Sequence, residues 1–266
     1  MITADEYRTW PTESPDARRA YGPHPDQFGE LYLPAGDGPH PVLVLIHGGC
    51  WRARYGLEPL GRLCAAVRAE GVAVWSLEYR RIGGEGGWPV TLRDVAAGAD
   101  ALRTLDAPLD LRRVVAGGHS AGGHLALWLA ARPRLPRESP LWSPEPLELR
   151  GVLALAALAD LEAAARRGLC GTAVQELLGG EPEQLPERYV NASPTAWLPL
   201  GLPQRHLVGA ADTIVPPDYL DAIVARARAA GDDARLEVLE GAGHFELVGP
   251  HTAAWPAIRS ALLALI

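Results

Sequence analysis

Short apolar runs rich in β-branched residues alternate along the chain with longer segments in which apolar residues recur every three or four positions. The runs lie at 41–47, 72–79, 113–120, 151–158, 204–210 and 234–241. The longer segments lie at 57–70, 91–105, 122–131, 217–230 and 253–266. Continuous apolar runs are typical of strands covered on both faces, and the second spacing is typical of helices. Their alternation predicts right-handed βαβ units and a mostly parallel sheet, so we expect an α/β fold.

One long stretch interrupts this alternation. Residues 159–201 contain two short helical patterns, at 161–167 and 172–178, followed by a segment rich in Gly, Pro and Glu. An insertion of this length between two strands is usually functional. We interpret 159–201, called the lid below, as a cover over the carboxyl edge of the sheet.

The chain has 266 residues, 48% of them hydrophobic, and its 25 basic and 32 acidic side chains give a formal charge of −7. This composition excludes a disordered chain, and the single alternation of strands and helices favours one domain over two. The acidic balance argues against nucleic acid as a partner. No apolar run reaches the roughly 18 residues of a membrane span, and the polar N-terminus lacks a signal-peptide core. We therefore expect a cytoplasmic protein without a membrane partner.

The three cysteines are too few and too far apart in sequence for a disulfide framework or a CxxC metal site. Cys50, Cys64 and Cys170 are most simply interpreted as free, buried thiols in a reducing compartment. We expect neither a metal nor a cofactor.

The sequence Gly118-His119-Ser120-Ala121-Gly122 is a GxSxG motif, placed where a predicted buried strand ends and a helix begins. The chain reverses so sharply at such a turn that larger residues two positions before and after the serine would clash. The turn also lifts the hydroxyl above the sheet edge. A Gly-rich turn that binds an anion at a helix N-terminus is the alternative. The strand–turn–helix context favours Ser120 as a nucleophile.

A serine hydroxyl is a poor nucleophile until a base takes its proton, and that base needs a carboxylate to orient it. Among eight histidines, His244 is favoured because it follows the last predicted strand on a loop at the carboxyl edge. His251 lies nearby but marks the entry to the terminal helix. Asp212 follows a predicted strand and precedes His244, whereas Asp218 falls at the start of a helix, where an acid merely favours the helix dipole. Because all basic residues are Arg, a Ser-Lys dyad is excluded.

The segment His47-Gly48-Gly49-Cys50-Trp51, called the HGG loop below, follows the predicted strand at 41–47. A tetrahedral intermediate places negative charge on oxygen, and backbone N–H groups must already point there. Glycines let the main chain approach that closely. We assign the oxyanion donors to the backbone of Gly48, Gly49 and Ala121, with an ordinary glycine turn as the alternative.

These motifs, with EYR at Glu78–Arg80 and NASP at Asn191–Pro194, resemble the α/β-hydrolase superfamily in residues and in order. Within it, the chain is most similar to the branch of hormone-sensitive-lipase-like esterases and kynurenine formamidases (arylformamidases), because HGGxW is the pattern associated with kynurenine formamidase. The resemblance covers 28–266 and leaves residues 1–27, the N-terminal arm, unmatched. It implies an α/β-hydrolase catalytic domain at 28–266 that includes the lid.

By this resemblance Ser120, Asp212 and His244 form the catalytic triad, and His47 and Trp51 support the HGG loop. The implied reaction is the hydrolysis of N-formylkynurenine to kynurenine and formate. A short-acyl carboxylesterase of acetyl or feruloyl type is the alternative, since HGGxW also occurs in such enzymes. An inactive homologue that only binds a small ester or amide is a more remote one.

Aromatic residues on loops are candidates for the substrate pocket. Trp88 and Trp197 lie on predicted loops, and flat indoles could line a pocket for an aryl group. Ordinary packing is the alternative for each. Cys50, in the variable position of HGGxW, and Phe245, beside His244, are further candidates, although Phe245 also suits a role in packing the histidine loop.

Overall fold

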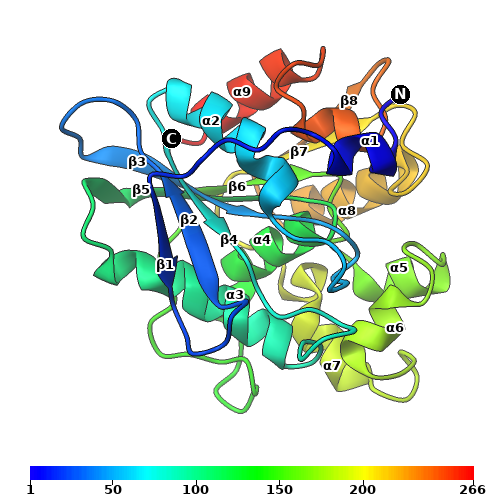
Figure 1. The fold of residues 1–266 in the computed structure, drawn as a ribbon. Helices are drawn as coiled ribbons and strands as arrows, with labels where there is room; N and C mark the ends of the chain where they lie inside the picture. Colours follow the sequence, from blue (N-terminus) through cyan, green and yellow to red (C-terminus); the bar gives the residue numbers. More distant parts are fainter.

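The predicted apolar runs form the parallel part of one sheet in the computed structural model, which describes all of residues 1–266. The strands are β3 (His40–Ile46), β4 (Ala73–Leu77), β5 (Leu109–His119), β6 (Gly151–Leu155), β7 (Gln204–Gly209) and β8 (Ala234–Leu239). They stand in the order β4-β3-β5-β6-β7-β8, and each pairs in parallel with its neighbours (Figure 1). The prediction of a mostly parallel sheet is therefore confirmed.

Two further strands, β1 (Ala17–Ala20) and β2 (Phe28–Tyr32), add an antiparallel edge that the sequence pattern did not predict. β1 is short and mostly exposed, and β2 carries Glu30 at its centre, so neither has a continuous apolar run. Glu30 is nevertheless buried, because Arg18 and the Tyr32 hydroxyl donate hydrogen bonds to its carboxylate. These hydrogen bonds offset the cost of burying a carboxylate that the sequence alone would place on the surface.

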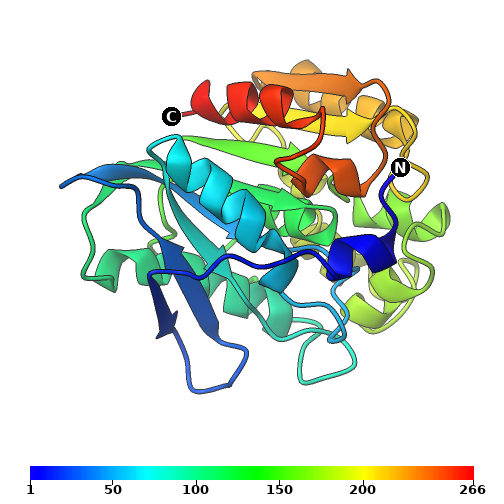
Figure 2. The same cartoon turned by 45° about the horizontal axis from the view of Figure 1, so that its top comes forward.

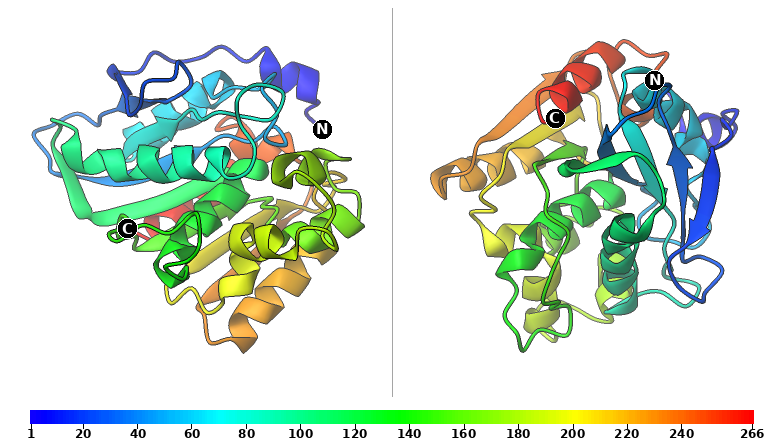
Figure 3. Two further views of the ribbon diagram at one scale, coloured as in Figure 1. Left: turned by 90° about the horizontal axis from the view of Figure 1, so that it is seen from below. Right: turned by 90° about the vertical axis from the view of Figure 1, so that its left-hand side faces the viewer.

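Helices cover both faces of the sheet. On one face lie α2 (Gly61–Ala69) and α9 (Trp255–Leu263); on the other lie α3 (Val90–Asp100), α4 (Ala121–Ala131) and α8 (Pro217–Ala229), as Figure 3 shows. Short 3₁₀ turns accompany them: η1 (Glu58–Leu60), η2 (Ala101–Thr104), η3 (Arg132–Arg134), η4 (Pro194–Trp197) and η5 (Phe245–Val248). Every residue of α4 is buried, which explains why this helix has no polar face in the sequence.

The lid contains α5 (Leu161–Arg166), α6 (Ala173–Leu178), α7 (Pro186–Ala192) and the turn η4. The helices α5 and α6 match the two predicted short helices, whereas α7 was not predicted. All three lie at the end of the sheet where the parallel strands finish (Figure 1). No helix of the protein is long and apolar enough to cross a membrane.

The N-terminal arm begins with a short helix, α1 (Ala4–Arg8), that the sequence did not predict. Thr3 caps it: its side chain accepts a hydrogen bond from the Glu6 backbone, and the Glu6 carboxylate accepts one from the Thr3 backbone. Figure 2 shows α1 beside η5, at the same end of the sheet as the lid.

Candidate active site

Ser120 occupies the turn between β5 and α4. Its backbone has a φ of 57° and a ψ of −119°, a conformation rare for residues other than glycine. The flanking glycines are required by close backbone contacts: a Cβ at Gly118 would lie 2.2 Å from the Gly122 carbonyl oxygen, and one at Gly122 would lie 2.0 Å from the Ile46 carbonyl oxygen. The turn therefore has the strained, crowded geometry that the motif predicts.

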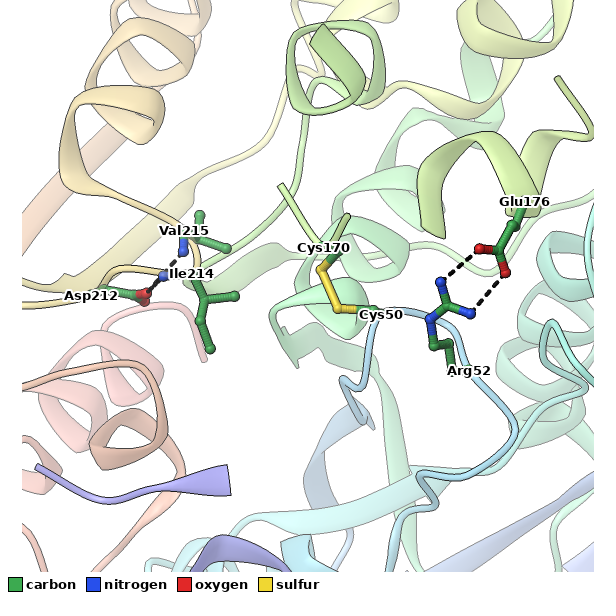
Figure 4. The surroundings of a disulfide bond; sticks show 7 residues. All are labelled: Cys50, Arg52, Cys170, Glu176, Asp212, Ile214 and Val215. Carbon is green, nitrogen blue, oxygen red and sulfur yellow. Dashed lines mark hydrogen bonds and ion pairs between the residues drawn. A yellow bond between two sulfur atoms is a disulfide. The ribbon is translucent and has the colours of Figure 1, made fainter. Parts of the chain in front are cut away.

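Asp212 and His244 form a buried hydrogen-bonded pair. The Nδ1–H of His244 donates to Asp212 Oδ2 at 2.7 Å, and both residues are less than a tenth exposed. Asp212 Oδ1 accepts the backbone N–H groups of Ile214 and Val215 at 2.8 Å each, which fixes the carboxylate (Figure 4). With its proton held on Nδ1, the imidazole presents an unprotonated Nε2 to a proton donor.

Ser120 and His244 line the same cavity, whose volume is about 310 Å³. No hydrogen bond joins the Ser120 hydroxyl to His244 in this structure; such contacts often tighten only when substrate binds. The alternatives lie elsewhere: His251 is exposed and packs edge-on against Trp10, and Asp218 pairs with Arg167 on the surface.

The HGG loop follows β3 and has an unusual backbone. Three consecutive residues, Gly49, Cys50 and Trp51, have φ values of 102°, 50° and 55°. This left-handed run turns the loop so that Gly48, Gly49 and Cys50 line the cavity, while the Trp51 ring is fully buried behind it against His124. Ala121 is buried at the start of α4 and is not among the lining residues.

A buried charge cluster supports the HGG loop from below. The His47 ring lies between two acceptors: its Nδ1 is 2.8 Å from the Gly48 carbonyl oxygen, and its Nε2 is 2.9 Å from Glu78 Oε1. Glu78 also binds Arg81 at 2.7 Å. Burial alone would raise the pKa of Glu78, but the charge and hydrogen bond of His47, with Arg81, hold it below its usual value. Glu78 is a site residue to which no role was assigned from the sequence, although it opens the EYR motif.

His119 is a second residue that sequence reasoning left without a role. It lines the cavity, and its Nε2–H donates to the backbone carbonyl of His244 at 3.0 Å. The two imidazole rings lie 4.4 Å apart between centroids. Burial, and then the charge of His244, lower the pKa of His119 well below its usual value, so His119 is neutral. A neutral ring here avoids repulsion with a His244 imidazolium.

The cysteines correct one expectation from the sequence. Cys50 of the HGG loop and Cys170 of the lid form a disulfide, with their Cα atoms 5.9 Å apart (Figure 4). The sequence could not pair them because they are 120 residues apart and only the fold brings the two loops together. Arg52 and Glu176 add a two-pronged ion pair across the same junction. The expectation of free thiols is wrong for Cys50 and Cys170 and is confirmed for the buried Cys64.

Two of the four predicted pocket residues lie elsewhere. Cys50 and Phe245 line the cavity, but Trp88 and Trp197 do not. Both indoles are half-buried against the core instead, and the Trp197 ring N–H donates to the Val190 carbonyl within the lid. The aromatic walls come from Tyr7 of α1 and Tyr55, which follows the HGG loop. No group of three or more His, Cys, Asp or Glu side chains is placed to hold a metal ion.

The fold and the site define an α/β-hydrolase. More specifically, the chain belongs to the BD-FAE family, whose model matches residues 30–224, a segment that includes Ser120 and Asp212 and ends before His244. Comparison with curated protein sequences finds no match.

Solved structures with the same fold include several esterases. A truncated carbohydrate esterase from gut microbiota is 19% identical, with a TM-score of 0.80 over 96% of this chain and 98% of its own. The bifunctional GH43-CE protein of Bacteroides eggerthii is 21% identical, with a TM-score of 0.76 over 95% of this chain and 38% of its own. Esterase 2 of Thermogutta terrifontis, phosphonylated by sarin, is 21% identical, with a TM-score of 0.72 over 95% of this chain and 93% of its own.

Proposed function

We propose that the protein is a serine esterase that cleaves short-acyl carboxylic esters through an acyl-enzyme on Ser120. The observation that carries this proposal is that the buried Asp212–His244 pair and the serine turn open onto one cavity, whose third wall is the HGG loop. The membership of the BD-FAE family and the esterases among the structural neighbours favour an ester as substrate.

In the proposed reaction, Ser120 Oγ attacks the carbonyl carbon of the ester while His244 Nε2 accepts the hydroxyl proton. Asp212 holds the imidazole in the tautomer that can accept it. The backbone N–H groups of Gly48, Gly49 and Ala121 stabilise the oxyanion that forms. His244 then gives its proton to the departing alcohol, and a water molecule, activated by the same ring, releases the acid and restores the serine.

His47 also contributes, by packing behind the HGG loop. Its hydrogen bond to the Gly48 carbonyl orients the Gly48–Gly49 peptide, and the ionised Glu78 keeps the ring in place. His47 is therefore a positioning residue for the oxyanion donors, and it transfers no proton in the reaction.

The arylformamidase reaction is the competing proposal, and it rests on the HGGxW resemblance alone. The family and the structural neighbours named above include esterases, so the ester is favoured. The two activities share the same nucleophile and base and differ in the bond that is cleaved, which makes a substrate panel the direct test.

The test compares the wild type with Ser120→Ala on p-nitrophenyl acetate, p-nitrophenyl butyrate and N-formylkynurenine, with labelling by a fluorophosphonate probe. We expect the highest kcat/KM on a short ester, and we expect Ser120→Ala to abolish both turnover and labelling. A higher kcat/KM on N-formylkynurenine than on both esters would replace the esterase proposal with the formamidase one. Labelling that persists in Ser120→Ala would reject Ser120 as the nucleophile, and a wild type that never acylates would favour the inactive homologue.

A further inference from the structure

The helix α1 forms one wall of the cavity that contains Ser120. Ala4, Tyr7 and Arg8 all line this cavity, together with Ser120 and His244. Ala4 and Tyr7 are three residues apart on the helix and therefore lie on one face of it. The wall comes from the N-terminal arm, which lies outside the segment matched by the family model.

Contacts on both sides of His244 hold this wall in place. The Tyr7 ring stacks on Phe245, with 5.1 Å between centroids, and it is only 9% exposed. The backbone N–H of Ile2 donates to Glu246 Oε1 at 2.6 Å, and the other oxygen of Glu246 accepts the N–H of Gly243 at 3.0 Å. The arm and the loop that carries His244 therefore form one packed unit.

The position of α1 depends on these contacts rather than on the helix itself. A helix of five residues is far too short to be stable alone in water. Trp10 packs edge-on against Tyr7 at 5.3 Å and closes the outer side of the ring. Tyr7 is thus the residue that both anchors the helix and faces the substrate space.

We propose that Tyr7, with Ala4 beside it, sets the size limit of the ester group that extends from Ser120 toward α1, so that the enzyme selects compact esters. This inference rests on the proposed esterase function. A rigid pocket wall excludes substrates whose ester group is too long to fit, and one methylene group in a protein pocket changes kcat/KM by about tenfold or more. Removing the Tyr7 ring would open the cavity toward solvent along the helix.

The experiment measures kcat/KM for two series of substrates. In the first, the acyl chain of p-nitrophenyl esters grows from acetate through butyrate to octanoate; in the second, the alcohol of acetate esters grows from methyl to octyl. The enzymes are the wild type, Tyr7→Ala, which widens the cavity, and Ala4→Leu, which narrows it. Tyr7→Phe tests rescue by a retained ring, and Thr9→Ala is the matched control, because Thr9 is exposed on the same arm and does not line the cavity.

We expect Tyr7→Ala to raise the efficiency on the longest ester relative to the shortest by at least about tenfold in one series, and Ala4→Leu to lower it by a similar factor. Tyr7→Phe should restore the wild-type ratio, and Thr9→Ala should keep it. Each rate is normalised to the fraction of enzyme that a fluorophosphonate labels, so that loss of folded protein does not mimic a change in selectivity. A ratio that stays within about twofold of the wild type in both Tyr7→Ala and Ala4→Leu would overturn the proposal while leaving esterase activity intact. A wild type that cleaves no ester would overturn both proposals.

Discussion

The disulfide between the HGG loop and the lid makes a quantitative prediction about stability. Replacing Cys170 by Ser removes the link without changing a residue that lines the cavity. The bond closes a loop with a sequence separation of 120, and the chain-entropy relation for such a loop gives about 5 kcal/mol of stabilisation at 25 °C. The ion pair between Arg52 and Glu176 spans the same junction, but because it is partly exposed it would compensate for less than about 1 kcal/mol of the lost stabilisation.

The assay is urea unfolding followed by circular dichroism, with and without a dithiol reductant. Cys170→Ser should unfold at a urea concentration more than about 1 M below that of the oxidised wild type. The reduced wild type should match the variant, and the reductant should not affect the variant. A midpoint for Cys170→Ser equal to that of the oxidised wild type would refute the reasoning, as would an equal effect of reductant on both proteins.

The remaining predictions concern the serine turn, the acid and the buried histidines. Gly122→Ala should lower the free energy of unfolding by about 3 kcal/mol or more, because its Cβ would lie 2.0 Å from the Ile46 carbonyl oxygen. Gly84→Ala, whose Cβ has no contact under 3.4 Å, is the control. Equal losses in the two variants would contradict the steric argument. Asp212→Asn should fold, but its kcat should fall by about 10⁴-fold, because the amide N–H would donate to His244 Nδ1 and favour the tautomer that has its proton on Nε2. A loss below about tenfold would reject Asp212 as the orienting acid. Three histidines are buried with a lowered pKa: His119, His124 and His206. The unfolded chain binds protons at these histidines below about pH 6.5, whereas the folded chain takes up protons at His124 and His206 only near pH 4, and burial keeps the pKa of His119 well below its usual value. The free energy of unfolding should therefore fall as the pH drops from 6.5 toward 4, by at most about 4 kcal/mol per pH unit for the three histidines together. A flat profile measured by urea unfolding at pH 7, 6 and 5 would contradict this.

The parallel core and the positions of the serine, acid and base segments followed from local pattern. The central strands β3 and β6 are apolar along most of their length, and Ser120, Asp212 and His244 each come after a strand of the parallel sheet. Because the carboxyl ends of parallel strands meet at one edge of the sheet, the three were expected together without knowledge of the packing. The antiparallel edge was missed because β1 is short and exposed, and because β2 carries Glu30, a buried charge that only tertiary pairing reveals.

The missing parts of the site share a physical reason. Cys170, Tyr7 and Glu78 reach the site from segments that are distant in sequence. Nothing in the local sequence marks Cys170 or Tyr7, and the EYR motif that begins with Glu78 does not reveal its contact with His47. Tyr7 lies in a mostly polar stretch, and its ring is covered by Phe245 from the other end of the chain. The indoles of Trp88 and Trp197 were assigned to the pocket because they lie on loops, but loop position does not determine which way a side chain faces.

The lid divides the proposed catalytic residues along the chain. It connects β6 to β7, so the nucleophile Ser120 precedes it and both Asp212 and His244 follow it. A break in the backbone at 180–184, beyond Cys170, would leave the disulfide within the first fragment and the acid–base pair within the second. Neither fragment alone holds a complete site, and the parallel pairing of β6 with β7 joins the two parts of the sheet. Hydrolysis by this enzyme is therefore also a direct readout of whether the two halves of its sheet have joined.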